Sequence, residues 1–335
     1  MTGRHAPSPV HPGQPRVIAV VVTHNRRDLL LESLAAVHGQ TRAPDAVIVV
    51  DNASSDGAAA AVRDRFPGAR LAELARNTGG AGGFAAGLAL ALADGADLAW
   101  LMDDDTVPGP GALRALLEAR DRYPGEAPAV VASRVLWTDG RAHPMNTPRP
   151  KPFARGPERA AAAAAGCVPV RSASFVSVLV DAAACRRSGL PQADYFLWND
   201  DFEFTTRLLR AAPGLLCPAS VVVHKTATFG STDADPGPRF FYEVRNKVWT
   251  LRARASLAPA ERVLYGGATL RRWARAFARS GDRRALGSAL ARGLAAGVRT
   301  RPRPTREVLA AAGLTVPALG PAGQHEPTGA ITNSR

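Results

Sequence analysis

The sequence predicts an α/β protein built on a mostly parallel, Rossmann-like sheet flanked by helices, followed by a basic helical region. Two patterns indicate this. Between residues 17 and 105, four short apolar runs alternate with three segments of helical periodicity, as in parallel sheets. From Arg239 to Arg306, 17 Lys and Arg residues stand against 3 Asp and Glu residues, an excess of +14 in a chain of net charge +13.

Each element of the first half follows from its local pattern. The β-branched run that starts at residue 17 is typical of a buried strand, and Leu30, Leu34 and Val37 recur at helical spacing just after it. The same reasoning predicts further strands within 45–51, 69–77 and 97–103, and helices within 56–66 and 79–95.

The second half is less regular. A helix is predicted over 109–123, followed by an irregular stretch to about residue 165 that contains a mobile loop with a short helical piece. The remaining predictions are a strand and a helix within 172–189, an aromatic strand end and an acidic helix start within 194–214, a late strand within 221–230, and helices from about residue 238.

Composition limits the class of protein. Three cysteines without CxxC spacing predict reduced thiols and no disulfide framework or zinc site. No signal peptide is visible, and no apolar run approaches the ~20 residues that cross a bilayer. The local excess of positive charge indicates an anionic partner: phosphates, membrane headgroups or nucleic acid.

Polar residues follow four of the predicted strands. In parallel sheets, ligands bind beyond the carboxyl ends of the strands, so we expect these residues to share one site. They form the stretches THN (23–25), DNASSD (51–56), RNTGG (76–80) and DDD (103–105).

The acidic triplet Asp103, Asp104 and Asp105 is the strongest of these signals. Two carboxylates two residues apart suit a hard cation such as Mg²⁺ or Mn²⁺ that also binds a substrate phosphate. An acidic turn that caps the next helix is an equally good interpretation of the triplet alone, and its position beside three other polar strand ends favours the metal. Asp51 could accept hydrogen bonds from a base or ribose, or form an Asx turn with Asn52.

A second acidic cluster, Asp200 and Asp201, lies among aromatic residues. A carboxylate in such surroundings can act as a general base, although two acids at a helix start also fit a simple capping role. His224 follows an apolar run and could complete a metal site. Arg239 and Arg245 either face solvent or neutralise a diphosphate.

The motifs quoted so far, in this order, resemble the family 2 glycosyltransferases with the GT-A fold. The similarity runs from about residue 17 to 255, through VVVTHNRRD, VIVVDNASSDG, RNTGGAGGF, WLMDDD, FLWNDDFEF, VVHK and RFFYEVRNKVW. It is greatest to the bacterial galactofuranosyltransferases and rhamnosyltransferases. The resemblance implies inverting, metal-dependent transfer of one sugar from a nucleotide donor, with galactofuranose from UDP-galactofuranose expected and rhamnose from dTDP-rhamnose as the alternative.

The resemblance also implies roles for individual residues. Asp103, Asp105 and His224 would hold Mn²⁺ or Mg²⁺. Asp201 would be the catalytic base, with Asp200 the other member of the acidic pair. Trp198, Arg239 and Arg245 would lie at the substrate, where the WN pair at 198–199 departs from the pattern of near relatives. The expected nucleotide-binding set is Thr23, Asn25, Asp51, Arg76, Asn77, Gly80 and Asp104.

The resulting domain division has a disordered leader (1–16), a GT-A catalytic domain (17–237), a basic helical region (238–312) and a disordered tail (313–335). Within the catalytic domain we expect a nucleotide-binding half (17–105) and an acceptor half (106–237).

We expect a cytoplasmic enzyme, peripheral on the inner face of the plasma membrane through its basic helices, that acts on a cell-envelope glycan or a polyprenyl-linked acceptor. The basic helices could equally be a helical pair packed on the domain with solvated arginines. A nucleic-acid-binding protein is a rival interpretation of the basic segment, but few aromatic residues are interleaved there for base stacking, so no nucleic acid is expected.

Overall fold

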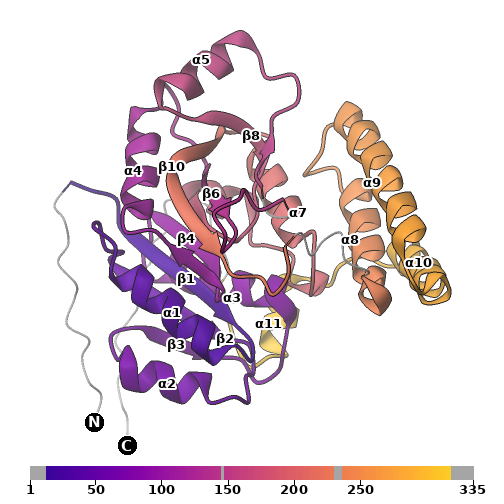
Figure 1. Cartoon of the computed structure of the whole chain (residues 1–335), viewed down its shortest axis with the longest axis horizontal. Helices are drawn as coiled ribbons and strands as arrows, with labels where there is room; N and C mark the ends of the chain where they lie inside the picture. Colours follow the sequence, from indigo (N-terminus) through magenta and orange to yellow (C-terminus); the bar gives the residue numbers. More distant parts are fainter. Residues whose placement is uncertain (1–12, 145–146, 230–235, 318–335) are drawn as a thin grey trace, which may run out of the picture.

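A ten-stranded sheet runs through the computed structural model, which describes residues 13–144, 147–229 and 236–317 (Figure 1). Strands β3, β2, β1 and β4 are parallel, as predicted, while β9 lies antiparallel between β4 and β6. The strand order is β3 (Arg70–Glu73), β2 (Ala46–Asp51), β1 (Val17–Thr23), β4 (Leu98–Asp103), β9 (Val178–Asp181), β6 (Val130–Leu136), β10 (Gly214–His224), β8 (Val168–Ser172) and β7 (Arg149–Pro150), with β5 (Thr106–Pro108) paired to β10.

Helices cover both faces of this sheet. Because side chains alternate along a strand, Val17, Ala19 and Val21 of β1 join the core on the side of α1, α2 and α4, whereas Val20 and Val22 join the core on the side of α3. The helices are α1 (Arg27–His38), α2 (Ala58–Arg65), α3 (Gly79–Ala93), α4 (Ala112–Arg122), α5 (Gly156–Ala164), α6 (Ala182–Ser188), α7 (Asp200–Leu208), α8 (Phe240–Arg252), α9 (Pro259–Arg279), α10 (Arg283–Arg299) and α11 (Thr305–Ala310).

Two sequence predictions in the second half were wrong. The stretch expected to be irregular contains β6, in the middle of the sheet. Its apolar run is interrupted by Ser133, whose buried hydroxyl bonds to the hydroxyls of Ser177 at 2.7 Å and Ser220 at 2.8 Å. The aromatic strand end is instead a single 3-10 turn, η1 (Ala193–Tyr195), followed by a loop.

The C-terminal helices form a separate layer beside the sheet (Figure 1). Phe240 and Val244 of α8 pack against Trp273 of α9 and against Leu286 and Ala289 of α10. The chain then returns to the main body, where α11 packs against α3 and η1.

Both ends of the chain lie partly outside the described residues. Leu314 and Val316, in the segment predicted as a tail, pack against the main core, whereas residues 1–12 of the predicted leader and 318–335 of the predicted tail are not described. The three cysteines are buried and free. Among the described helices, none has the length and apolarity that a membrane crossing requires.

Candidate active site

The predicted metal ligands come together at the carboxyl end of β4. Asp103 ends β4, and Asp105 lies in the turn before β5. His224 ends β10 and pairs with Thr106 of β5, which brings its ring to the same place. One ligand atom each from Asp103, Asp105 and His224 lies within 4.8 Å of the others.

The chemistry of this group fits a divalent cation. Two carboxylates and one imidazole are ligands that Mn²⁺ accepts, with room left for phosphate oxygens. Nε2 of His224 lies 2.9 Å from Oδ1 of Asp105. Within the described residues, Nδ1 of His224 has no hydrogen-bonding partner.

Arg26, which the sequence analysis missed, adds a positive charge to this cluster. Its guanidinium lies 2.6 Å from Oδ2 of Asp105 and 3.3 Å from Oδ1 of Asp104. An arginine directly before helix α1 is unfavourable, because its charge repels the positive end of the helix dipole. This placement is the feature of the sequence that could have indicated an anionic neighbour. Because 52% of the Arg26 side chain is exposed, it can also meet an anionic ligand.

The carboxyl groups of the triplet differ in acidity. Burial raises the pKa of Asp103 well above its usual value, and the charges of Asp105 and Asp104 add to this. Burial raises the pKa of Asp104 to about 6, although Arg26 opposes the shift. Burial also acts to raise the pKa of Asp105, but His224 and Arg26 outweigh it and lower the value. Such mutual repulsion is relieved when a cation binds.

The predicted nucleotide-binding residues line the neighbouring strand ends. Thr23 donates a hydrogen bond from Oγ1 to Oδ2 of Asp104 at 2.8 Å, and it pairs in register with Asp51 of β2. Asp51 accepts a hydrogen bond from the amide of Ser54 at 2.9 Å, three residues on, whereas the Asx turn that was its alternative interpretation would use the amide two residues on. Asn25 accepts from the amide of Ser55 at 2.7 Å, which joins the ends of β1 and β2.

The glycine-rich turn is attached to the end of β2. Asn52 donates to the carbonyl of Gly79 and accepts from the amide of Thr78, each at 2.8 Å. Asn77 accepts from the amide of Gly79 at 2.7 Å. Arg76 and Asn77 are exposed beside this turn, and Gly80 is the second residue of α3.

The acidic pair begins helix α7 next to the metal cluster. Asp200 acts on the charge state of Asp103, which places the two acidic clusters within electrostatic reach of each other. Burial raises the pKa of Asp200 to about 8, and the charge of Asp201 adds to the shift. Burial also raises the pKa of Asp201, but Ser174, the Phe202 amide, Lys247 and Arg149 all act to keep Asp201 ionised.

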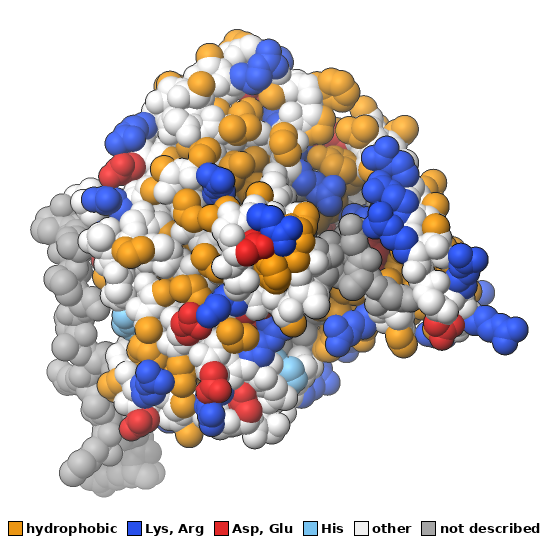
Figure 2. Space-filling model, in the orientation of Figure 1, with side chains coloured by type: hydrophobic (Ala, Val, Ile, Leu, Met, Phe, Trp, Pro, Cys, Tyr) orange, Lys and Arg blue, Asp and Glu red, His pale blue; other side chains and the backbone are white. Residues whose placement is uncertain are grey.

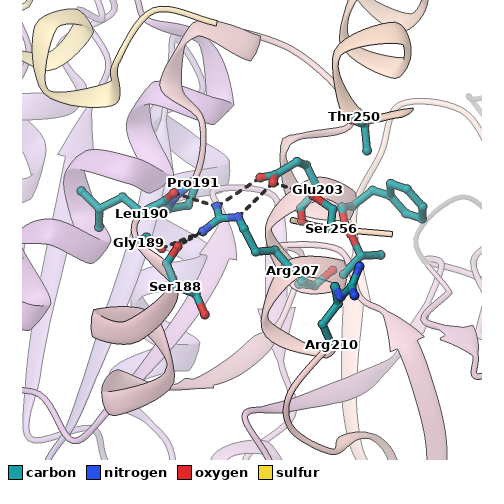
Figure 3. A network of polar contacts seen from close by, with 12 residues as sticks. Ser188, Gly189, Leu190, Pro191, Glu203, Arg207, Arg210, Thr250 and Ser256 are labelled. Atoms are coloured by element: carbon teal, nitrogen blue, oxygen red, sulfur yellow. Dashed lines mark hydrogen bonds and ion pairs between the residues drawn. The ribbon is translucent and has the colours of Figure 1, made fainter. Parts of the chain in front are cut away.

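Polar contacts further along α7 anchor the helix (Figure 3). Arg207 forms a two-pronged ion pair with Glu203 at 2.9 and 3.1 Å. Arg207 also donates to the carbonyl of Leu190 at 2.9 Å, and Glu203 accepts from Ser256 at 2.8 Å. The helix that carries the acidic pair is thus fixed to the loops before η1 and after α8.

The loop between η1 and α7 has an unusual backbone. Phe196, Trp198 and Asn199 have φ angles of 63°, 65° and 67°, a region that side chains other than glycine rarely adopt. Asn246 of α8, fully buried, donates from Nδ2 to the carbonyls of Tyr195, Leu197 and Trp198, each at 2.9 Å. This side chain holds the strained loop, and strain of this kind is typical of functional sites.

Arg245 acts on the same loop. Its guanidinium donates to the carbonyls of Asp194 at 2.8 Å and Tyr195 at 3.1 Å, and it lies 4.2 Å from the ring centroid of Trp249. These contacts give Arg245 a part in holding the loop, and its binding to substrate stays a prediction. Arg239 is exposed at the start of α8, and Trp198 is half-buried.

The loop also touches the glycine-rich turn. Gly79 has φ 70°, and a Cβ atom added there would lie 1.9 Å from the carbonyl oxygen of Phe196. Only glycine allows so close an approach. The amide of Ala81 donates to the same oxygen at 3.3 Å.

The geometry described so far fits a glycosyltransferase: a group of residues that could hold a divalent cation lies at the edge of the sheet, with an acidic pair beside it. Comparison with known proteins agrees. The family described as Glycosyl transferase family 2 matches residues 18–179. Galactofuranosyltransferase GlfT1 of Mycobacterium tuberculosis is 34% identical over 256 residues, which cover 70% of this chain and 82% of that protein. GlfT1 of Mycolicibacterium smegmatis is 51% identical over 92 residues, 28% of this chain and 30% of that protein.

Solved structures share the fold. S. aureus TarS 1-349 in complex with UDP-GlcNAc superposes with a TM-score of 0.57 at 16% identity, over 88% of this chain and 84% of that one. The mannosyltransferase PcManGT from Pyrobaculum calidifontis, in complex with GDP-Man and Mn²⁺, gives 0.51 at 22% identity, over 92% and 81%. The fold is therefore GT-A, and the chain is a glycosyltransferase. It belongs to glycosyltransferase family 2.

Proposed function

We propose that this enzyme is an inverting, metal-dependent galactofuranosyltransferase that moves galactofuranose from UDP-galactofuranose to a cell-envelope glycan or a polyprenyl-linked acceptor. The observation that carries the proposal is the convergence of Asp103, Asp105 and His224 within 4.8 Å, beside the Asp200–Asp201 pair. The identity to galactofuranosyltransferases over most of the chain supports the choice of sugar.

The residues suit a direct displacement. Asp201 takes the proton of the acceptor hydroxyl as its oxygen attacks the anomeric carbon, on the face opposite the leaving UDP. A divalent cation held by Asp103, Asp105 and His224 would supply positive charge where the diphosphate departs. Arg26, half-exposed beside the same carboxylates, adds a second positive charge on that side.

Asp201 is the better candidate for the base because of its surroundings. In a pair of neighbouring carboxyl groups, one retains a proton longer than the other. Burial raises the pKa of both groups, to about 8 for Asp200, so Asp200 retains the proton near neutral pH; Ser174, Lys247 and Arg149 oppose the rise at Asp201 alone. An ionised carboxylate is the form that a general base requires.

A thermal-shift screen tests the donor and the metal together. We expect UDP and UDP-galactofuranose to raise Tm in the presence of Mn²⁺ but not in EDTA, because ligand at 100 times its Kd adds about 2.7 kcal/mol to stability. In the double variant Asp105→Ala/His224→Ala, the rise in Tm that depends on Mn²⁺ should disappear. A larger shift with dTDP-rhamnose would favour a rhamnosyltransferase, and an equal UDP shift in EDTA would contradict the metal site.

We also infer a peripheral membrane contact through α9. Val263 is 78% exposed and Leu270 64% exposed, and Arg271 and Arg275 are exposed on the same helix. Lys and Arg side chains gather on the surface formed by the C-terminal helices (Figure 2). An apolar stripe edged by arginines suits an anionic lipid surface.

Vesicle sedimentation tests this contact. The protein should sediment with vesicles that contain anionic phospholipid and stay in solution with neutral phosphatidylcholine vesicles. The variant Arg271→Glu/Arg275→Glu should lose sedimentation while keeping its Tm. Wild-type protein that remains in solution with anionic vesicles would refute the contact.

A further inference from the structure

Two of the three cysteines face each other across neighbouring strands of the sheet. Strands β8 and β10 run antiparallel, with Val168 of β8 opposite Leu216 of β10. The next opposed positions in this register are Cys167, directly before β8, and Cys217. Directly opposed residues of antiparallel strands have Cα atoms about 4.5–5.5 Å apart, within the range of about 4.4–6.8 Å that a disulfide spans. The backbone therefore places these two cysteines at bridging distance.

The two thiols are also in contact. The thiol of Cys167 donates a hydrogen bond to the sulfur of Cys217, and this bond lowers the pKa of Cys217 to about 6, although burial opposes the shift. The amides of Ser220 and Ala219, in the bulge that follows Cys217 in β10, donate to the same sulfur. In its protonated form Cys217 donates instead to the carbonyl of Ala115, at 3.5 Å. The donors around Cys217 favour the thiolate, which is the reactive form of cysteine.

Cys185 lacks these features and provides a comparison within the same chain. It is fully buried on α6, and burial raises its pKa to about 12. A thiol in such surroundings is unreactive. Cys167 is instead 7% exposed, and its chain neighbours Gly166 and Val168 are both exposed. A small oxidant can therefore reach the pair from the side of Cys167.

We propose that Cys167 and Cys217 form a site of reversible oxidation, at which a peroxide converts the two thiols into a disulfide that joins the start of β8 to β10. The thiolate of Cys217 attacks one oxygen of the peroxide, so that an S–O bond forms, the O–O bond breaks and hydroxide leaves. The sulfur of Cys167 then attacks the sulfur of Cys217, which forms the S–S bond and releases water with the Cys167 proton. The two thiols supply the two electrons that reduce one hydrogen peroxide to two waters.

The bridge would enclose the part of the chain that carries the acidic pair. Both thiols are free in the structure, so the bridge forms only on oxidation. The enclosed segment, 167–217, contains the loop at 196–199 and all of α7. A bridge of this kind restricts the unfolded chain, so the oxidised protein should melt at a higher temperature than the reduced protein. The oxidation involves no step of sugar transfer and is therefore independent of the proposed function.

Thiol counting after oxidation tests the pair. The folded protein is treated with hydrogen peroxide, then unfolded, alkylated and analysed by mass spectrometry. We expect Cys185 to be alkylated, and Cys167 and Cys217 to be joined with the loss of two hydrogens. Dithiothreitol should restore all three thiols. Three alkylated cysteines after peroxide, or a bridge between two copies of the chain, would overturn the proposal.

Variants of each cysteine separate the roles of the two sulfurs. Cys185→Ser is the matched control and should form the bridge at the wild-type rate. Cys217→Ser should lose its remaining thiols at least about 10-fold more slowly than wild type, because the thiolate is gone. Cys167→Ser should stop at the sulfenic acid of Cys217, which dimedone traps. Equal rates in Cys217→Ser and wild type, or no dimedone adduct in Cys167→Ser, would contradict these roles.

The melting temperature tests the geometry of the bridge. Oxidised wild type should have a higher Tm than the same protein reduced with dithiothreitol, whereas peroxide should leave the Tm of Cys167→Ser/Cys217→Ser unchanged. A bridge that lowers the Tm would show that the strands must move apart to form it, and would overturn the inference from the register of β8 and β10.

Discussion

Replacing Asp201 with Asn is expected to lower sugar transfer by about 10³-fold and to leave UDP binding intact, since a positioned general base contributes about 10²–10⁴-fold to rate. The amide is nearly isosteric but cannot take the proton of the acceptor hydroxyl. Initial rates of transfer and calorimetric titration with UDP and Mn²⁺ measure the two effects separately.

Asp200→Asn is the matched control for this prediction. The pKa of Asp200 is raised to about 8, so its carboxyl is protonated near neutral pH, and an amide resembles that neutral form. We expect its rate to stay within about 5-fold of wild type at pH 7, as for a group whose charge is not needed. If Asp200→Asn were the inactive variant and Asp201→Asn the active one, the two roles would have to be exchanged.

The second large effect is expected from Asn246→Ala. The change leaves the carbonyls of Leu197 and Trp198 without this donor, while the Tyr195 carbonyl keeps Arg245, and it costs about 2 kcal/mol in the free energy of unfolding. The loop at 196–199 would then be free to leave its strained backbone, and transfer should fall more than UDP binding. Urea unfolding and steady-state rates of the same preparation measure both.

Arg252→Ala provides the comparison within the same helix. Arg252 also donates to three backbone carbonyls, those of residues 297, 298 and 300, but its side chain is exposed and those carbonyls belong to the end of α10, not to the loop at 196–199. Its removal should cost at most about 1 kcal/mol, because water replaces exposed hydrogen bonds. Equal losses in the free energy of unfolding of the two variants would show that the hydrogen bonds of Asn246 to the loop contribute no more than those of Arg252.

The first half of the fold could be predicted because its signals are local. The apolar runs of β1, β2 and β4 are buried on both faces, so these strands are visible without knowledge of their neighbours. The strand β6 escaped prediction because Ser133 and Arg134 interrupt its run, and Ser133 is acceptable only because Ser177 and Ser220 are its partners in the sheet. Those partners lie 44 and 87 residues away in the sequence.

One part of the candidate site could likewise be predicted from local signals, and another part could not. The metal cluster was predicted because strand ends and acidic residues coincide in the sequence, and the structure brings Asp103, Asp105 and His224 together. The shape of the loop at 196–199 could not be predicted, since residues with ordinary preferences are held in an unusual backbone by Asn246, about fifty residues later. Long-range contacts of this kind leave no periodic pattern.

The close contact between Gly79 and Phe196 couples the glycine-rich turn to the loop at 196–199. One peptide belongs to the glycine-rich turn and the other to the loop that leads to Asp201, and neither can be displaced without the other. In the proposed function, a sugar donor that displaces the turn would therefore also displace the loop before the base. We expect ordered binding from this contact, with the nucleotide sugar binding first.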